Sequence, residues 1–234
     1  MPGLEMTLPG LHDFASARLP RCPAGAAALD LGAGSGAWAD RLSTLGYVVT
    51  AVDANADTFQ GQSPFIAADL DHDDFVSALE APFDLITAVE VIEHLESPVG
   101  FLRSIVSLLG PDGVVLLTTP NVDSAPSKMK FLLKGKLRGM DEHGDPTHLS
   151  PILWWTFVNR VLPRVGLDLV ARYGFPPQTF NSGRPAFTRA FRLFAPLLRD
   201  DVLTGDIHVL LMRKDRESSA VEEALDVKSH RGSG

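Results

Sequence analysis

The order of apolar runs and helical segments constrains the fold of this chain more than any other feature of its sequence. Apolar runs typical of buried strands occur at residues 27–31, 48–52, 65–68, 85–89, 114–118, 167–173 and 207–212. Helical segments lie between or beside them, at residues 37–45, 73–79, 98–109 and 151–162. Strands that alternate with helices form βαβ crossovers, which build a parallel sheet covered by helices on both faces. The sequence therefore predicts a doubly wound α/β domain.

The chain of 234 residues divides into a lead-in, one domain and a tail. Residues 1–26 form a helical lead-in with a short helix expected at 11–19, and residues 27–214 form the domain. The polar and charged residues 215–234 are expected to be a disordered tail. The alternation breaks over residues 121–150, which we expect to form a lid insert together with a second lid segment at 174–201.

Cysteine content and charge restrict the cellular setting. The single cysteine, Cys22, cannot form an internal disulfide, which favours a reducing compartment. No apolar run reaches the length of about 18 residues that a membrane span needs, and no secretory leader is recognised, so we expect a cytoplasmic protein. The net charge of −8 disfavours nonspecific binding to nucleic acid, which depends on Lys and Arg neutralising phosphates. No feature of the sequence specifies an oligomeric state.

A glycine-rich turn follows the first predicted strand, in the sequence Ala-Leu-Asp-Leu-Gly-Ala-Gly-Ser-Gly at residues 28–36. Gly32, Gly34 and Gly36 permit positive φ angles and let a ligand approach the backbone closely. A tight strand-to-helix turn in any α/β protein would account for the same residues. Their spacing differs from the G-x-G-x-x-G pattern of dinucleotide-binding turns, and no Ser/Tyr/Lys catalytic set follows. Both facts disfavour a nicotinamide-dependent oxidoreductase.

Two aspartates end the next two predicted strands. Asp53 follows the second strand about 20 residues beyond the glycines, where an acid can accept hydrogen bonds from both hydroxyls of a ribose. Asp69 ends the third strand. Either residue alone could be a helix cap or a turn residue. Because open α/β sheets bind ligands at the carboxyl ends of their strands, the pair favours a nucleoside site.

A series of segments, taken in order, resembles the motifs of class I S-adenosylmethionine-dependent methyltransferases. They are Leu-Asp-Leu-Gly-Ala-Gly-Ser-Gly (29–36), Val-Asp-Ala-Asn (52–55), Ala-Ala-Asp-Leu (67–70), Phe-Asp-Leu-Ile-Thr-Ala-Val-Glu-Val-Ile-Glu-His-Leu (83–95) and Leu-Leu-Thr-Thr-Pro-Asn (116–121). The resemblance covers about residues 27–170. It implies the family's Rossmann-like fold, a seven-stranded and mostly parallel sheet whose last strand, at 207–212, is antiparallel.

The resemblance also implies how the cofactor S-adenosylmethionine binds. The glycines at 32, 34 and 36 would line its methionine end, and Asp30 would orient the glycine loop or the cofactor's amino group. The residues implied at the ribose, the adenine and the reactive end are Asp53, Ala54, Asp69, Leu70 and Glu90.

The segment Glu90-Val91-Ile92-Glu93-His94 follows the fourth predicted strand. Two carboxylates and an imidazole close together are typical of a hard-metal site or of an acid/base site. His148 and His143 occur later, in and after the predicted insert.

Quinone-biosynthesis O-methyltransferases and small-RNA methyltransferases carry a similar Glu-x-x-Glu-His segment. That resemblance implies a divalent metal ion, such as Mg²⁺ or Mn²⁺, held by Glu90, Glu93, His94 and His148, with His143 as the reserve ligand. Without a metal, Glu93, His94 and His148 are the candidate catalytic residues, because a neutral imidazole can accept a hydroxyl proton. A third interpretation is structural, with Glu93 and His94 only capping the next helix or orienting a substrate.

Two basic stretches stand out in an acidic chain. The first comprises Lys128, Lys130, Lys134, Lys136 and Arg138, and the second comprises Arg184, Arg189, Arg192 and Arg199. They are either amphipathic helices with solvated basic faces or a site for an anionic partner such as a membrane surface, a lipid-linked phosphate or a nucleotide sugar. The insert also resembles methyltransferases of polysaccharide and glycolipid assembly.

Together these features predict a methyltransferase that O-methylates a hydroxyl of a small-molecule, sugar or lipid-linked substrate. O-methylation is favoured because a hydroxyl needs a base or a metal to remove its proton, and the Glu/His set offers both. N-methylation, or cofactor binding without catalysis, remains open.

Overall fold

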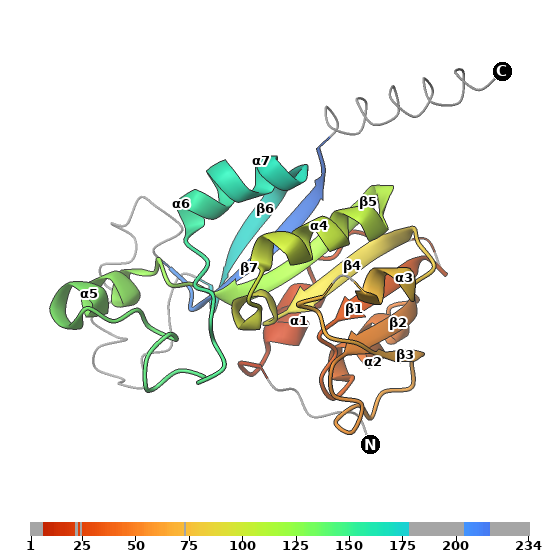
Figure 1. The fold of residues 1–234 in the computed structure, drawn as a ribbon, viewed down its shortest axis with the longest axis horizontal. Coiled ribbons are helices and arrows are strands. Elements are labelled where there is room, and N and C mark those ends of the chain that lie inside the picture. The colour runs from red at the N-terminus through yellow and green to blue at the C-terminus, as the bar shows by residue number, and fades with distance from the viewer. Residues whose placement is uncertain (1–6, 22, 24, 73, 178–203, 216–234) are drawn as a thin grey trace.

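A seven-stranded sheet with the strand order β3-β2-β1-β4-β5-β7-β6 forms the centre of the computed structural model, which describes residues 7–21, 23, 25–72, 74–177 and 204–215 (Figure 1). Its strands are β1 (Ala27–Leu31), β2 (Val48–Asp53), β3 (Phe65–Ala67), β4 (Phe83–Val89), β5 (Leu109–Pro120), β6 (Leu167–Phe175) and β7 (Ile207–Lys214). β1 to β5 pair in parallel, whereas β7 is antiparallel to both β5 and β6. The predicted sheet, with its antiparallel last strand, is confirmed.

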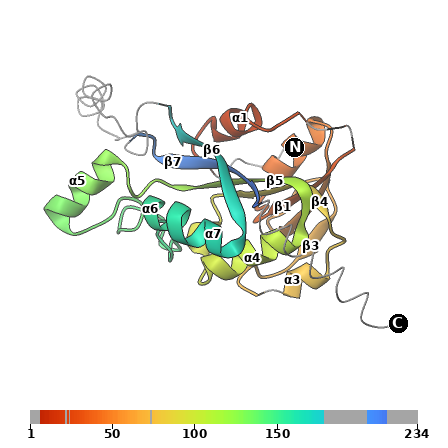
Figure 2. The ribbon, with the colours of Figure 1, turned by 90° about the horizontal axis from the view of Figure 1, so that it is seen from above.

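Helices cover both faces of this sheet. They are α1 (Leu11–Ser16), α2 (Ala37–Thr44), α3 (Asp74–Ser77), α4 (Pro98–Leu108), α5 (Ala125–Lys134), α6 (Trp154–Thr156) and α7 (Leu162–Val165). Figure 2 shows α1 on one side of the sheet and α3, α4 and α7 on the other. Successive strand residues point to opposite faces, so Leu29 packs in the core with α4 while Ala28 packs in the core with α1 and α2. This burial on both faces explains why the central strands are almost wholly apolar.

The helix predicted at 151–162 begins and ends later than expected and is not uniform. It starts as α6, widens into a π-helical segment over Phe157–Val161 and ends as α7. Pro163 explains the irregularity, because proline has no backbone N–H and its ring clashes with the carbonyl four residues before it. Gly166, with a φ of 76°, ends the helix.

β5 is longer than predicted and contains the turn signal Pro-Asp-Gly. β4 advances only from Phe83 to Leu85 while β5 advances from Leu109 to Val114, so the extra residues bulge out of the ladder. The predicted turn is therefore an irregularity within the strand.

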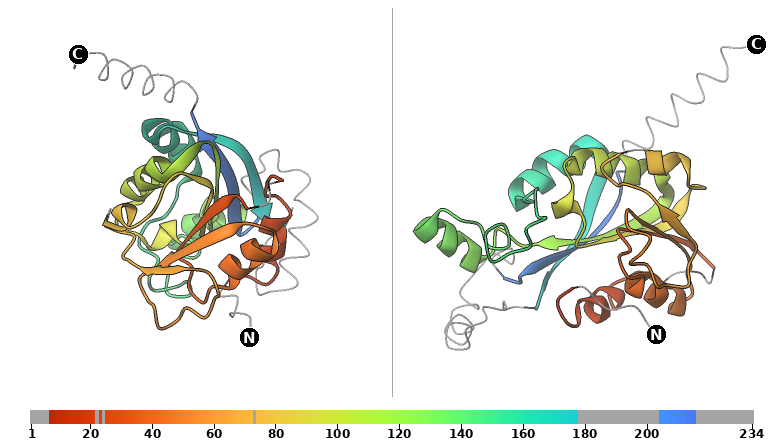
Figure 3. Two further views of the ribbon diagram at one scale, coloured as in Figure 1. Left: turned by 90° about the vertical axis from the view of Figure 1, so that its right-hand side faces the viewer. Right: turned by 60° about the horizontal axis from the view of Figure 1, so that its bottom comes forward.

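The predicted insert leaves the sheet at the end of β5 and carries α5, which protrudes from the body (Figures 1 and 3). Its first residue, Asn121, donates its backbone N–H to Asp206 O (2.7 Å). At its far end, Leu149 N and Ser150 N both donate to the backbone oxygen of Glu93, at 2.8 and 2.9 Å. Backbone hydrogen bonds thus fix the first end of the insert next to β7 and the far end next to the residues that follow β4.

Parts of the other predicted segments lie outside the described residues. This applies to residues 178–201 of the second lid segment, including its arginines, to residues 216–234 of the tail, and to Cys22. Gly174 and Phe175, predicted to begin the second lid segment, belong to β6. Among the described residues, no helix is long and apolar enough to cross a membrane.

Candidate active site

The glycine-rich turn between β1 and α2 uses backbone conformations that suit glycine. Gly32, Gly34 and Gly36 have φ angles of 74°, 51° and 84°. A Cβ on Gly32 would overlap Val91 Cγ2, and one on Gly36 would lie 2.7 Å from the backbone of Gly61. The turn therefore packs closely against Val91 and Gly61, and a side chain larger than that of glycine would not fit at Gly32 or Gly36.

Asp53, at the end of β2, is joined directly to the glycine turn. Its Oδ2 accepts a hydrogen bond from Gly34 N (2.8 Å), and its Oδ1 accepts one from Asn55 N (2.9 Å). Each carboxylate oxygen can accept a second hydrogen bond, so both retain capacity for ribose hydroxyls. Ala54 is exposed beside Asp53.

A cavity of about 540 Å³ opens at the carboxyl ends of β1 and β4. From the predicted cofactor set it is lined by Asp30, Gly32, Gly34 and Glu90, and from the predicted catalytic set by His94 and His148. Its walls do not include Gly36, Asp53, Ala54, Asp69 or Leu70. The structure thus brings part of the predicted cofactor set and the two histidines together in one space.

Asp30 is the most buried acid of this cavity. Only 1% of it is exposed, and its Oδ1 accepts a hydrogen bond from Thr87 Oγ1 (3.0 Å). Its Oδ2 has no hydrogen-bond partner among the described residues. Burial raises the pKa of this carboxyl from 3.8 to about 7. A ligand ammonium group beside Oδ2 would supply the missing partner, so the site fits the amino-acid end of S-adenosylmethionine.

The predicted adenine residues lie away from this cavity. Asp69 is exposed, and its Oδ1 accepts a hydrogen bond from Asp71 N (3.0 Å). The side chain of Leu70 is buried in the hydrophobic core.

The short helix expected at 11–19 contributes to the cavity as α1, whereas sequence reasoning gave no role to Leu8 or to α2. Leu8, His12 and Trp38 also line the cavity, and Trp38 is only 3% exposed. Trp38 could have been predicted to line the cavity from its position in the sequence, two residues after Gly36 of the glycine turn.

Glu90 sits at the end of β4 with a φ of 55°, the single described residue other than glycine with a positive φ. Thr118 holds it there, since its Oγ1 accepts from Glu90 N (2.9 Å) and donates to Glu90 Oε1 (2.9 Å). Burial raises the pKa of Glu90 to about 7. Positive φ in a bulky residue is uncommon and tends to mark functional sites.

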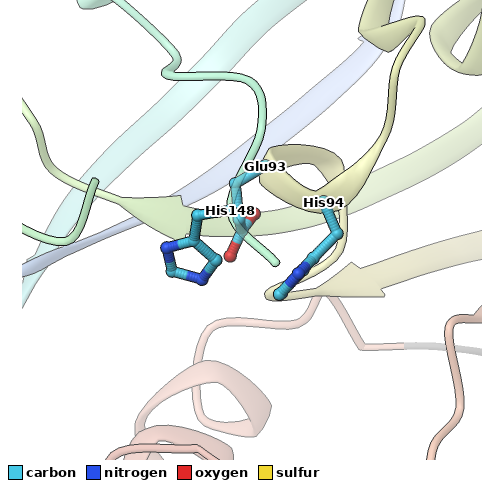
Figure 4. Close-up of side chains that lie close together, drawn as sticks. All are labelled: Glu93, His94 and His148. Carbon is cyan, nitrogen blue, oxygen red and sulfur yellow. The ribbon is translucent and has the colours of Figure 1, made fainter. Parts of the chain in front are cut away.

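Glu93, His94 and His148 form a cluster in which one ligand atom from each lies within 4.8 Å of the others (Figure 4). Glu93 is fully buried, and its Oε2 accepts a hydrogen bond from Thr119 Oγ1 (3.0 Å). Its Oε1 has no hydrogen-bond partner among the described residues. Burial and the nearby Glu90 carboxylate raise the pKa of Glu93 well above its usual value.

The hydrogen bonds of the two histidines assign their tautomers. His148 Nδ1 lies 2.8 Å from the carbonyl oxygen of Gly139, which can only accept, so Nδ1 carries the proton. His94 Nδ1 lies 2.8 Å from Thr147 Oγ1, whose own proton is donated to Asp145 Oδ1 (2.5 Å). In the neutral form of each imidazole, Nε2 is therefore the nitrogen without a proton. Burial and the neighbouring His148 lower the pKa of His94, which keeps its ring neutral at pH 7.

Not every predicted ligand joins this cluster. Glu90 is not part of the group, although it lines the same cavity. His143 lines a different cavity, so His148 is the downstream histidine that the structure places beside Glu93 and His94.

Comparison with known proteins agrees with this geometry. A family model described as a methyltransferase domain matches residues 8–162, more than half of the chain. The chain belongs to this methyltransferase family. It is similar to a ubiquinone biosynthesis O-methyltransferase of Xanthomonas axonopodis, with 32% identity over 117 residues, which is 47% of this chain and 48% of the relative. The chain thus matches about half the length of that relative.

Solved structures of low sequence identity show the same fold. A SAM-dependent methyltransferase from Archaeoglobus fulgidus superposes with a TM-score of 0.62 at 19% identity, covering 87% of this chain and 94% of that one. The [4+2]-cyclase SpnF superposes with a TM-score of 0.57 at 17% identity, covering 88% of this chain and 80% of that one. The methyltransferase domain thus has the Rossmann-like fold expected from the sequence, and the activity has to be argued from the site.

Proposed function

We propose that this protein is an S-adenosylmethionine-dependent methyltransferase that methylates a hydroxyl oxygen of a small-molecule substrate. The observation that carries the proposal is that His94 and His148 line the cavity beside the glycine turn, with the buried carboxyl group of Glu93 next to both. A hydroxyl must lose its proton to become a good nucleophile, and this cluster offers groups that can accept or displace it. The partly matching O-methyltransferase relatives support the same reaction.

For the cofactor, we propose that Gly32, Gly34 and Gly36 lie along the methionine end and that Asp30 binds the amino group. The residues proposed for the ribose, the adenine and the reactive end are Asp53, Ala54, Asp69, Leu70 and Glu90. S-adenosylmethionine supplies a methyl carbon that an oxygen can attack, with the electron pair of the broken carbon–sulfur bond leaving on sulfur. The protein then has to position the hydroxyl, exclude water and accept the proton.

Two arrangements of the cluster achieve this. In the first, Nε2 of His94 or His148 accepts the hydroxyl proton directly. In the second, Glu93, His94 and His148 would hold a divalent ion, with Glu90 as the remaining predicted ligand, and such an ion would lower the pKa of a bound hydroxyl. One carboxylate and two imidazoles suit Mn²⁺, Fe²⁺, Co²⁺ or Zn²⁺ as well as Mg²⁺.

The decisive experiment combines chelation with substitution on the full chain. If the ion is required, a chelator abolishes methyl transfer, added metal restores it, and His94→Ala and His148→Ala are inactive while still binding S-adenosylhomocysteine. If the chelator has no effect but either histidine variant is inactive, the direct base is correct. Full activity of Glu93→Ala, His94→Ala and His148→Ala would make the cluster structural. A product methylated on nitrogen would move the assignment to N-methylation, and cofactor binding without any turnover would support a non-catalytic role.

Helix α5 supports a contact with a membrane surface. Phe131, Leu132 and Leu133 are 55%, 79% and 73% exposed, and Lys134 follows them in the last turn. An apolar patch beside basic residues on a protruding helix suits anionic lipid.

Sedimentation with phosphatidylcholine vesicles, with and without phosphatidylglycerol, tests this contact. Leu132→Asp should reduce binding to the anionic vesicles. Leu45→Asp, at a residue that is 50% exposed at the end of α2, is the matched control. Equal binding of both variants would remove α5 from the contact. For the compartment, the lone cysteine supports the cytoplasm.

A further inference from the structure

A second cavity, of about 320 Å³, lies beside the cofactor cavity, and Glu90 and Leu8 form part of the wall of both. Its volume is at the lower end of the range of about 300–1,000 Å³ that is common for ligand sites. Its remaining walls come from the end of β5, from the insert and from the approach to β7. A small ligand in this space would therefore lie next to Glu90, at the edge of the proposed methyl-transfer site.

Four charged side chains of the second cavity form two pairs of opposite charge. Lys130 on α5 forms an ion pair with Asp141, whose side chain is 2% exposed. Arg138 Nη1 lies 2.6 Å from Asp206 Oδ1, and the Asp206 side chain is 9% exposed. Because each pair joins one base and one acid, the two pairs add no net charge, and Glu90 is a further acidic group on the wall.

This lining discriminates between classes of ligand. An apolar tail would take two ion pairs out of water without offering them any hydrogen bond, which is costly. An anion would be repelled by the carboxylates of Asp141 and Asp206 as strongly as it is attracted by their partners. A neutral molecule with several hydroxyl groups can donate to the carboxylates and accept from Lys130 and Arg138 at the same time.

Ser124 provides an independent indication. It lines the second cavity and is 1% exposed, yet its Oγ has no hydrogen-bond partner among the described residues. It also occupies the N-cap position of α5 without making the side-chain hydrogen bond that such a residue usually makes. Buried hydroxyl groups are almost always hydrogen-bonded, so a ligand hydroxyl is the fitting partner.

We infer that the second cavity is the acceptor subsite and that it takes a neutral, polyhydroxylated ring such as a sugar unit. The reacting hydroxyl would extend past Glu90 to the Glu93/His94/His148 cluster. There its oxygen bonds to the methyl carbon, the carbon–sulfur pair leaves on sulfur, and the hydroxyl proton passes to the cluster. The inference rests on the methyl-transfer function proposed above and adds the substrate class to it.

Ligand-observed NMR on the full chain saturated with S-adenosylhomocysteine tests the inference. The probes are the methyl glycosides of glucose, mannose and galactose, with catechol as an aromatic diol. We expect at least one glycoside to bind. Because each substitution removes one hydrogen-bonding group, Lys130→Met and Ser124→Ala should each weaken that binding about tenfold. Lys136→Met is the matched control, since Lys136 is on the same insert and pairs with the exposed Glu142 outside the cavity.

The outcomes separate this inference from the proposed function. Normal S-adenosylhomocysteine binding without binding of any glycoside, or with binding of catechol alone, would overturn the sugar class and leave methyl transfer standing. Glycoside binding that Lys130→Met and Ser124→Ala leave unchanged would overturn the location. A wild-type chain that does not bind S-adenosylhomocysteine at all would refute the proposed function itself.

Discussion

Nδ1 of His94 lies 2.8 Å from Oγ1 of Thr147, a residue 53 positions later in the chain. Because Thr147 donates its own proton to Asp145, it can only accept from His94. The insert thereby decides which nitrogen of a histidine in the cavity carries the proton. This makes Thr147 a positioning residue for any use of His94 Nε2, whether as a base or as a metal ligand.

Replacing Thr147 by Val should release this control. Long-range ¹H–¹⁵N spectra should report the Nδ1–H tautomer of His94 in the wild type and a mixture of tautomers in Thr147→Val, because Val offers no acceptor. Thr147→Ser keeps the hydroxyl and should keep the wild-type spectrum. His94→Gln identifies the signal. An Nε2–H tautomer in the wild type would contradict the assignment.

Replacing Asp53 by Ala should weaken cofactor binding. The substitution removes the proposed partner of the ribose hydroxyls and also the acceptor of Gly34 N. Losing such hydrogen bonds costs about 1–3 kcal/mol, so calorimetry with S-adenosylhomocysteine should show an affinity roughly 5- to 150-fold lower. Asp84→Ala, which removes an exposed acceptor for Ala27 N at the other end of the strands, is the control. Equal affinities of the two variants would exclude Asp53 from the site.

Asp30 should make the cofactor-free protein less stable as the pH rises. Its folded pKa of about 7 exceeds the ordinary 3.8, so the folded state holds the proton more tightly than the unfolded state. This stabilisation is complete below pH 3.8 and is lost as the pH rises through 7.

The comparison of Asp30→Asn with wild type isolates this effect, because Glu90 and Glu93 contribute slopes of the same sign to both proteins. Melting temperatures measured between pH 5 and 8 should fall less steeply in Asp30→Asn than in wild type. Parallel curves would show that Asp30 titrates normally.

Gly32→Ala should destabilise the fold more than Gly25→Ala. Both glycines have positive φ, of 74° and 84°, so the backbone strain is similar in the two variants. A Cβ on Gly32 overlaps Val91, whereas one on Gly25 meets no atom of the described residues within 4 Å. Overpacking adds about 1–3 kcal/mol, which chemical denaturation can measure. Gly32→Ala combined with Val91→Ala should recover much of the difference, and its failure to do so would place the strain elsewhere.

The sheet could be predicted because its signals are local. Each strand is a short apolar run, and its neighbours in the chain fix the crossover. The glycine turn and Asp53 also follow from local spacing, since Gly34 N and the Asp53 carboxylate meet wherever β1 and β2 lie side by side.

The partners of the cluster could not be predicted in the same way. Contacts such as Gly139 O with His148, or Asp145 with Thr147, depend on the path of an insert that has no periodic pattern. Trp38 was missed because an aromatic residue in a first helical turn most often belongs to the core. The π-helical segment before Pro163 shows a further limit, since a proline signals an interruption without specifying how the helix accommodates it.

The backbone oxygen of Glu93 receives both Leu149 N and Ser150 N, while Asn121 N is bonded to Asp206 O. The intervening stretch is consequently a segment with two fixed joints, at Asn121 and at Leu149 and Ser150, and the second joint lies next to His94. Residues 125–138 lie between those joints and include none of Glu93, His94, Thr147 and His148, so we expect both joints to tolerate changes there. Exchanging residues 125–138 between related chains should therefore redirect acceptor choice while the catalytic groups stay in place, which makes this segment a natural unit for recombination and for engineering.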